Sequence, residues 1–305
     1  MDFVLPPRQL FFTSRSYHYS YIHITGASNR GTLLLIHGFP SHIDDWIHQI
    51  RYFESRGYGL LVPDMLGYGE SSAPAEADAY RLKLISQDLA ELLDHAQLEQ
   101  VVGVGHDWGV TILSRLAIYH PRRLKALALL GIGAPKPGTT FDLDGINSMA
   151  KEATGSEMLG YVTYISRDPE SHQMMEEHAE SVMEIMFASD SQSWGLHLHP
   201  SGGFKSFVEG GFRQPVGTWF VEELRRRHLE AFRRPNGYRG PSCYYKMLDL
   251  NLSVSDEVEF ANFIIEQPQM LSVWASDVVT LRVNSGHWIH LERGDETSQA
   301  LERLL

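Results

Sequence analysis

The sequence predicts an α/β fold: a doubly wound, mostly parallel sheet that carries an inserted α-helical segment. Three observations support this prediction. Short apolar runs alternate with helical patterns up to residue 134, only helical patterns follow between residues 135 and 248, and the alternation returns from residue 249. We therefore expect two core segments, 1–134 and 249–305, with a helical insertion at 135–248.

Four apolar runs bounded by Gly or Pro are typical of buried strands: Thr32–Ile36, Gly59–Val62, Gln100–Val104 and Ala126–Leu130. Helical patterns lie between them, at about 44–56, 80–96 and 109–119. Such alternation indicates a parallel sheet with helices on both faces. The segment Tyr17–Ile24 alternates polar and apolar residues, so we expect it to be an edge strand.

The insertion contains two clear helix signals. Asp168-Pro169-Glu170 predicts a helix start, and the apolar stripe that follows is typical of core packing. That stripe consists of Met175, Val182, Met183, Met186 and Phe187. A further helix is predicted between Thr218 and Asn236. After the insertion, Val278–Val283 is expected to form a strand and 294–305 a closing helix.

The composition excludes several classes of protein. Among the 305 residues, 43% are hydrophobic and 21% are charged, which is ordinary for a globular protein. No apolar run approaches the roughly 18 residues of a membrane span, and the first residues do not resemble a signal peptide. The single cysteine, Cys243, favours a reducing compartment, the cytoplasm. The net charge of −12 argues against a nucleic-acid partner.

The sharpest motif is Val-Gly-Val-Gly-His-Asp-Trp-Gly, at residues 102–109. A buried strand leads into a small-X-Asp-X-small turn, and a helix follows. This arrangement is a nucleophile elbow with Asp107 at the position where many hydrolases have Ser. The helix N-terminus favours an anion there. The alternative is that Asp107 merely caps the helix.

Two further motifs complete a candidate catalytic set. In His37-Gly38-Phe39-Pro40, which follows a strand, the backbone N–H of Phe39 should converge with that of Trp108 to form an oxyanion hole. In Ser285-Gly286-His287-Trp288, His287 follows the nucleophile in the chain and precedes the last helix, so it is the candidate general base.

The combination HGFP, PDMLGYGESSAP, GHDWG and GHW resembles the epoxide hydrolases of the α/β-hydrolase superfamily, over nearly the whole chain. The resemblance implies an α/β-hydrolase fold whose insertion is a cap. It also implies that a small apolar epoxide is opened to a vicinal diol through an ester on Asp107, without a cofactor.

In that family, two cap tyrosines donate hydrogen bonds to the epoxide oxygen. The resemblance assigns these roles to Tyr161, with Tyr164 as the alternative, and to Tyr245. Near the second tyrosine, Cys243-Tyr244 replaces the usual Asn-Trp, so Tyr244 remains an alternative. Trp108, Tyr164 and Tyr244 are the candidate substrate-binding residues.

The acid that should orient His287 departs from the family pattern. Asp277 is the nearest candidate, but only nine residues separate it from His287. A parallel crossover needs about a dozen residues. Either the crossover helix is missing, or residues 268–276 are that helix and the seventh strand with its acid is missing. We therefore name Asp277 as the acid. If the seventh strand is missing, the C-terminal part of the sheet is shortened.

Two other functions compete with this one. A dehalogenase shares the Asp nucleophile and the following Trp, but haloalkane dehalogenases usually have Asn where Phe39 stands, and fluoroacetate dehalogenases have Arg where Trp108 stands. A catalytically impaired relative could instead bind a small ligand. The pair His197-X-His199 offers two metal ligands without a third at suitable spacing, so no metal site is predicted. The sequence leaves the oligomeric state open.

Overall fold

A computed structural model describes residues 4–190, 192–261 and 279–305. The chain divides into two units, each with its own internal contacts. The sheet unit comprises Met1–Ser72, Arg81–Thr139 and Ser253–Leu305, and the helical unit comprises Ala73–Tyr80 and Thr140–Leu252. No helix among the described residues is both long enough and apolar enough to span a bilayer.

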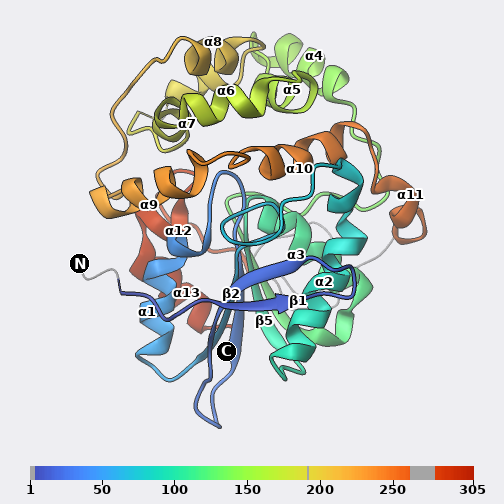
Figure 1. Cartoon of the computed structure of the whole chain (residues 1–305), viewed down its shortest axis with the longest axis vertical. Coiled ribbons are helices and arrows are strands. Elements are labelled where there is room, and N and C mark those ends of the chain that lie inside the picture. The colour runs from blue at the N-terminus through green and yellow to red at the C-terminus, as the bar shows by residue number, and fades with distance from the viewer. Residues whose placement is uncertain (1–3, 191, 262–278) are drawn as a thin grey trace. The chain divides into compact units, whose positions relative to one another are not determined.

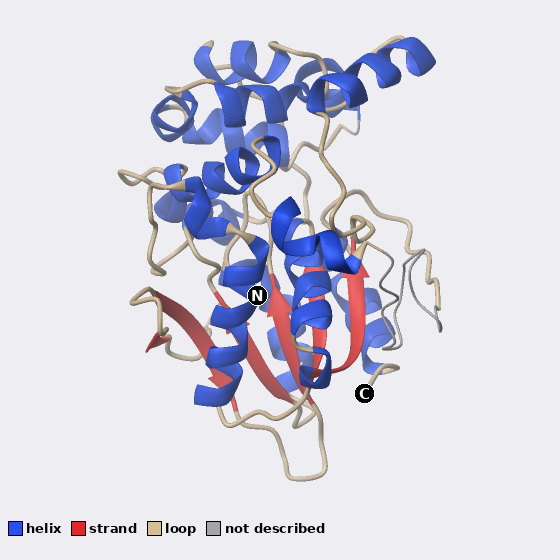
Figure 2. Ribbon diagram, turned by 90° about the vertical axis from the view of Figure 1, so that its right-hand side faces the viewer, coloured by secondary structure: helices blue, strands red, loops and turns tan. Residues whose placement is uncertain are grey.

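The sheet has six strands in the order β1-β2-β4-β3-β5-β6. Figure 2 draws its strands in red, with helices in blue. Their bounds are β1 Gln9–Phe12, β2 His18–Ile24, β3 Thr32–Ile36, β4 Gly59–Pro63, β5 Val101–His106 and β6 Leu124–Leu130. The four predicted buried strands form its parallel part, from β4 through β3 and β5 to β6. The sheet is therefore mostly parallel and places the carboxyl ends of those four strands along one edge.

The prediction of an edge strand at Tyr17–Ile24 is wrong in its position. This segment forms β2, which pairs antiparallel with β1 on one side and with β4 on the other. The edge strand is β1, which the sequence analysis missed. It has only four residues, Gln-Leu-Phe-Phe, and is mostly exposed, so it shows no buried run and no alternation.

Helices cover both faces of the sheet, as the alternation predicts (Figure 1). On one face, alternate strand residues such as Leu33 and Leu35 pack against α1 (Ile47–Glu54) and α13 (Gly294–Glu302) in a single buried cluster. On the other face, α2 (Leu82–His95) packs against α3 (Trp108–Tyr119). The period-two pattern of each strand thus supplies apolar side chains to both helical layers.

The prediction of a strand at Val278–Val283 is wrong for the residues that the structure describes. Residues 279–283 form no strand, and the chain next becomes regular at α12 (Ile289–Glu292). Residues 280–283 alternate between exposed and half-buried. A period-two pattern does not specify a partner strand, so it did not predict whether this segment pairs. Residue 278 lies outside the described residues.

The helical unit consists of short helices. They are α4 Leu143–Thr154, α5 Gly160–Arg167, α6 Ser171–Glu177, α7 Ala179–Met186, α8 Gly203–Glu209, α9 Glu222–Phe232 and α10 Arg239–Asp249, with η4 at Trp194–Leu198. The helix predicted at Asp168 starts at Ser171 and is interrupted at His178, whose backbone leaves the helical region. The predicted apolar stripe along α6 and α7 is buried, which confirms it as core.

An ion pair joins three segments of the sheet unit near the ends of the insertion. The Arg115 guanidinium of α3 donates two hydrogen bonds to Glu257 of α11 (Val254–Glu257), at 2.9 and 2.8 Å. Arg115 also donates to the carbonyl of Pro135, and Glu257 accepts from the N–H of Gly138. Both charged side chains are buried, so the pair depends on this complete set of partners.

Candidate active site

Asp107 occupies the turn between β5 and α3. Its φ of 53° and ψ of −122° lie outside the regions that a non-glycine residue ordinarily adopts. Such a conformation costs roughly 1–3 kcal/mol and persists where surrounding contacts hold it. The Asp107 side chain accepts no capping hydrogen bond from the helix that it precedes. The Asp107 carboxylate is therefore not an N-cap of α3, although the N–H of Trp108, the first residue of α3, bonds to it.

Glycines on both sides of Asp107 make this turn possible. A Cβ on Gly105 would collide with the backbone of Gly109, and a Cβ on Gly109 would collide with the carbonyl of Ile36 in β3. Neither position could carry a side chain without moving the backbone of a neighbouring segment. The spacing Gly-X-Asp-X-Gly is thus a packing requirement of the strand-to-helix turn.

The carboxylate of Asp107 is held by backbone N–H groups. The N–H of Phe39, in the loop after β3, donates to Oδ1 of Asp107 at 2.9 Å. The N–H of Trp108 also hydrogen-bonds to this carboxylate. Burial raises the pKa of Asp107 above its ordinary value, while nearby His287 and the two N–H groups act in the opposite direction. The two donors predicted for an oxyanion hole thus meet at Asp107.

His287 lies on the other side of the same carboxylate. Its Nε2 is 3.7 Å from Oδ2 of Asp107, and the two side chains are 15% and 19% exposed. Burial lowers the pKa of His287, and the negative charge of Asp107 partly counteracts that effect. The imidazole is therefore kept neutral down to a lower pH than a histidine in water, which is the state that a general base requires.

The sequence analysis gave His37 no role, although it belongs to the HGFP motif. Its Nε2 accepts a hydrogen bond from the N–H of Met65 at 3.0 Å, and its Nδ1 donates to the carbonyl of Gly38 at 3.0 Å. Burial lowers the pKa of His37 to about 4, so the ring stays neutral and can accept as well as donate. The His37 ring fixes the loop that directs the Phe39 N–H toward Asp107. The position of His37 directly before Gly38-Phe39 was the sequence signal that could have identified this role.

The helical unit brings two of the four candidate tyrosines together. The rings of Tyr161 in α5 and Tyr245 in α10 meet edge to face, with centroids 5.9 Å apart. Tyr164 instead donates its hydroxyl to Oε1 of Glu209 at 3.1 Å. Tyr244 is fully buried and packs edge to face against Tyr80. The structure thus pairs Tyr161 with Tyr245 and engages Tyr164 and Tyr244 elsewhere in the same unit.

One predicted site residue has no described position. Asp277, the proposed triad acid, lies outside the described residues.

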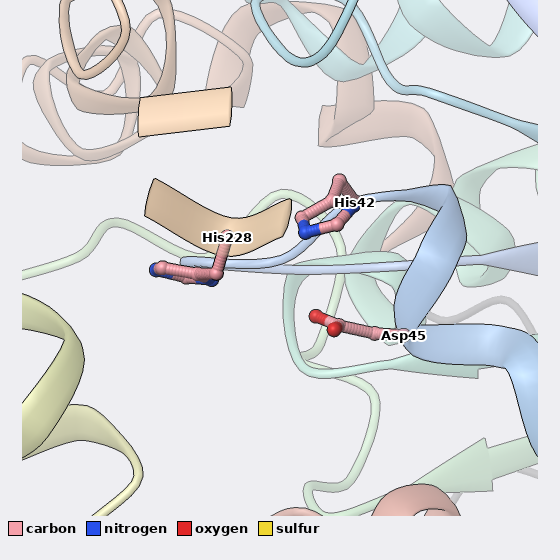
Figure 3. A group of neighbouring side chains, drawn as sticks. All are labelled: His42, Asp45 and His228. Carbon is pink, nitrogen blue, oxygen red and sulfur yellow. The ribbon is translucent and has the colours of Figure 1, made fainter. Parts of the chain in front are cut away.

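Figure 3 draws three buried side chains that carry metal-ligating atoms: His42 and Asp45 from the sheet unit and His228 from α9 of the helical unit. Within the sheet unit, Asp45 accepts a hydrogen bond from the Ser41 hydroxyl. Two ligands in one unit do not make a metal centre, so we assign none to these residues.

A carboxylate on a strained strand-to-helix turn, with two N–H donors and an imidazole beside it, has the arrangement of a nucleophile elbow in an α/β-hydrolase. Comparison with known proteins agrees with this class. Residues 31–194 match the family model described as alpha/beta hydrolase fold. The chain is 39% identical over 273 residues to epoxide hydrolase 3 of Siraitia grosvenorii, covering 88% of this chain and 82% of that protein.

Two further relatives extend the comparison. Bifunctional epoxide hydrolase 2 of Sus scrofa is 26% identical over 90% of this chain, which spans about half (48%) of that longer protein. The crystal structure of epoxide hydrolase A from Mycobacterium thermoresistibile shares the fold, with a TM-score of 0.80 at 24% identity and coverage of 99% of this chain and 98% of that one. This chain belongs to the epoxide hydrolases of the α/β-hydrolase fold family.

Proposed function

We propose that this protein opens small apolar epoxides to vicinal diols through a covalent ester on Asp107. The observation that carries the proposal is the unequal environment of the two carboxylate oxygens. Oδ1 of Asp107 is held by the Phe39 N–H, whereas Oδ2 faces the imidazole of His287. Oδ2 is therefore the attacking atom, and Oδ1 becomes the carbonyl oxygen of the ester.

Ester formation requires a nucleophile on one side of the epoxide and donors on the other. Oδ2 of Asp107 bonds to an epoxide carbon as the carbon–oxygen bond of the ring breaks. The leaving oxygen receives hydrogen bonds from Tyr161 and Tyr245, and one phenol supplies its proton. Phenols with a pKa near ~10 can donate in this way at neutral pH.

Ester hydrolysis then uses the other half of the site. His287 takes a proton from water, which attacks the carboxyl carbon of Asp107. The negative charge develops on Oδ1, where the N–H groups of Phe39 and Trp108 stabilise it. When the ester bond breaks, the leaving alkoxide takes the proton from His287. The proton of the carboxyl group formed at Asp107 returns to the tyrosine, and the diol leaves. A serine in place of Asp107 would form an ether that this machinery could not cleave.

The remaining assignments follow from the family resemblance. Residues 135–248 act as the cap, Asp277 orients His287, and Trp108, Tyr164 and Tyr244 contribute to substrate binding. The single, buried Cys243 supports a cytoplasmic location. A haloalkane dehalogenase would need a second side-chain halide donor where Phe39 stands, so that activity is the less favoured alternative.

A single turnover in heavy-oxygen water tests the mechanism. With enzyme in excess over styrene oxide or a fatty-acid epoxide, the label should enter the Asp107 carboxylate. Asp107→Ala should abolish turnover, while Glu54→Ala, which removes an exposed carboxylate of α1, should not. Label that enters only the diol would exclude the ester. Tight binding of the epoxide without turnover would favour the ligand-binding alternative.

The two tyrosines are tested by removing single hydroxyl groups. Tyr161→Phe and Tyr245→Phe should each slow ester formation, by less than the roughly 2.7–4 kcal/mol that one unshared oxyanion donor supplies, because the two are partly redundant. The matched control is Tyr52→Phe, which removes the hydroxyl that Tyr52 of α1 donates to Glu302 in the sheet unit. A Tyr161→Phe/Tyr245→Phe variant that forms the ester at the wild-type rate would remove both residues from the mechanism.

A further inference from the structure

One buried histidine beside the candidate site has no place in the mechanism above. His106 is the last residue of β5, directly before Asp107, and its side chain is fully buried. Its Nε2 donates a hydrogen bond to the backbone carbonyl of His287 at 2.9 Å, across 181 residues of sequence. This bond ties the segment that carries the base to the strand that carries the nucleophile.

The segment around His287 needs such a tie because it lacks regular secondary structure. The described residues 279–288 belong to no strand or helix, so sheet hydrogen bonds do not fix the backbone of His287. The preceding N–H, of Gly286, is held by the Glu292 carboxylate at 2.7 Å. Side chains thus bind both sides of the residue: Glu292 on the exposed side and His106 on the buried side.

Ring contacts also hold His106 in place. Its ring centroid lies 4.6 Å from that of His287, 4.3 Å from that of His290 and 5.1 Å from that of Trp288. Gly131, just after β6, leaves the space for this arrangement, because a Cβ there would come within 3.3 Å of the His287 carbonyl and 3.4 Å of the His106 ring. The donor is therefore confined to one orientation.

His290 provides a natural comparison. It is fully buried and its ring contacts that of His106, but neither of its ring nitrogens has a hydrogen-bond partner among the described residues. Of these two neighbouring buried imidazoles, the ring of His106 donates to the backbone of His287, and the ring of His290 does not.

We propose that His106 is a positioning residue for ester hydrolysis: its Nε2–H fixes the backbone of His287 and so aims the imidazole at the water that cleaves the ester. The inference rests on the proposed function, in which His287 acts in the second step only. Ester formation uses Asp107 and the two tyrosines and does not need His106. Burial, together with His290 and His287, holds the pKa of His106 well below its ordinary value, consistent with a neutral ring that carries its proton on Nε2.

Three variants separate the donor from the ring. His106→Phe keeps a planar ring and removes the donor, His106→Gln places an amide N–H near the position of Nε2, and His290→Phe makes the same ring replacement without losing a bond. Ester formation and ester hydrolysis are measured separately in single turnovers. We expect His106→Phe to slow hydrolysis by about 10- to 100-fold, the effect of a misplacement on the scale of an ångström. Formation should stay near the wild-type rate.

The other two variants decide between positioning and general disruption. His106→Gln should recover most of the hydrolysis rate, and His290→Phe should leave both steps unchanged. Equal slowing of both steps in His106→Phe, or an unchanged hydrolysis rate, overturns the proposal. If the phenyl ring prevents folding, His106→Leu supplies the variant without the donor.

A measurement that needs no turnover keeps this inference distinct from the proposed function. The pH titration of the His287 ring signals in isotope-labelled protein should change in His106→Phe and stay near that of the wild type in His106→Gln. A wild-type protein that forms no ester would contradict the proposed function, and these titrations would still test the tie. Identical His287 titrations in all variants would refute it.

Discussion

Adding one methyl group at Gly38 should disable Asp107, the proposed nucleophile. A Cβ on Gly38 would lie 2.5 Å from the Cβ of Asp107 and 2.7 Å from the backbone nitrogen of Trp108, and closer still to Oδ1 of Asp107. The backbone of Gly38 is not in the left-handed region, so the substitution is opposed by these contacts alone. The perturbation therefore acts directly on the carboxylate and on one of its N–H donors.

The size of the effect follows from those distances. Asp107 and residue 38 must separate by about 0.9 Å before their Cβ atoms reach the 3.4 Å at which ordinary contact begins. A misplacement of about 1 Å can cost on the order of 100-fold in rate. Loss of one oxyanion donor costs about 10²–10³ in rate, a cost that falls on ester hydrolysis in the proposed mechanism. We expect ester formation to slow at least about 100-fold, with an overpacking cost of roughly 1–3 kcal/mol in the free energy of unfolding.

Gly133→Ala is the matched control, because a Cβ at that position meets nothing within 4 Å. Both variants are assayed for the single-turnover rate of ester formation and for the midpoint of urea unfolding. The reasoning predicts a large loss of rate in Gly38→Ala alone. If Gly38→Ala forms the ester as fast as Gly133→Ala while remaining folded, the close approach of Gly38 to Asp107 does not constrain the site.

Three further predictions concern charge. Glu257→Gln should lower the free energy of unfolding by roughly 3–5 kcal/mol, because it leaves Arg115 buried without its counter-ion. In urea unfolding, the Arg115→Met/Glu257→Leu double variant should lose less stability than the two single variants lose together. A loss equal to their sum would contradict this coupling. Burial raises the pKa of Asp88 from 3.8 to about 6, so its contribution to stability is full below pH 3.8 and is lost as the pH rises to about 6. The stability of Asp88→Asn relative to the wild type should therefore rise as the pH increases from 3.8 to above 6, and a difference in stability that stays constant over this range would refute this. Ester formation should fall on the acid side at a pH above 3.8, because burial raises the pKa of Asp107 and attack needs the carboxylate; a rate that holds down to pH 3.8 would exclude this.

The turn at Asp107 could be predicted because its cause is local. The strand before it, the small residues at Gly105 and Gly109 and the helix after it lie within about a dozen consecutive positions. Each reflects a steric demand that the structure shows directly. The loop after β3 was predictable for a related reason: in a parallel sheet, the carboxyl ends of β3 and β5 meet at one edge, so Phe39 had to lie near Asp107.

The segment before His287 could not be predicted in the same way. Its alternating pattern is that of an extended chain, but membership of a sheet depends on a partner strand, which no local pattern specifies. The same limitation hid β1, whose pairing with β2 is visible only in the folded chain. Strand pairing is a non-local property, so errors concentrated at both ends of the sequence.

The local sequence pattern could not choose among the candidate tyrosines. Residues 161 and 164 are three apart in α5, a spacing that puts both on one side of a helix, so helical geometry alone cannot choose between them. The choice depends on Glu209, which lies 45 residues further along the chain and accepts the hydroxyl of Tyr164. Tyr244 and Tyr245 are adjacent and point in different directions, and the packing of Tyr80 against Tyr244 leaves Tyr245 to meet Tyr161. A hydroxyl that already serves a carboxylate is a poor donor to a substrate, so the contact with Glu209 argues against Tyr164. These distant partners, and not the spacing of the tyrosines, support the proposal that Tyr161 and Tyr245 act on the epoxide.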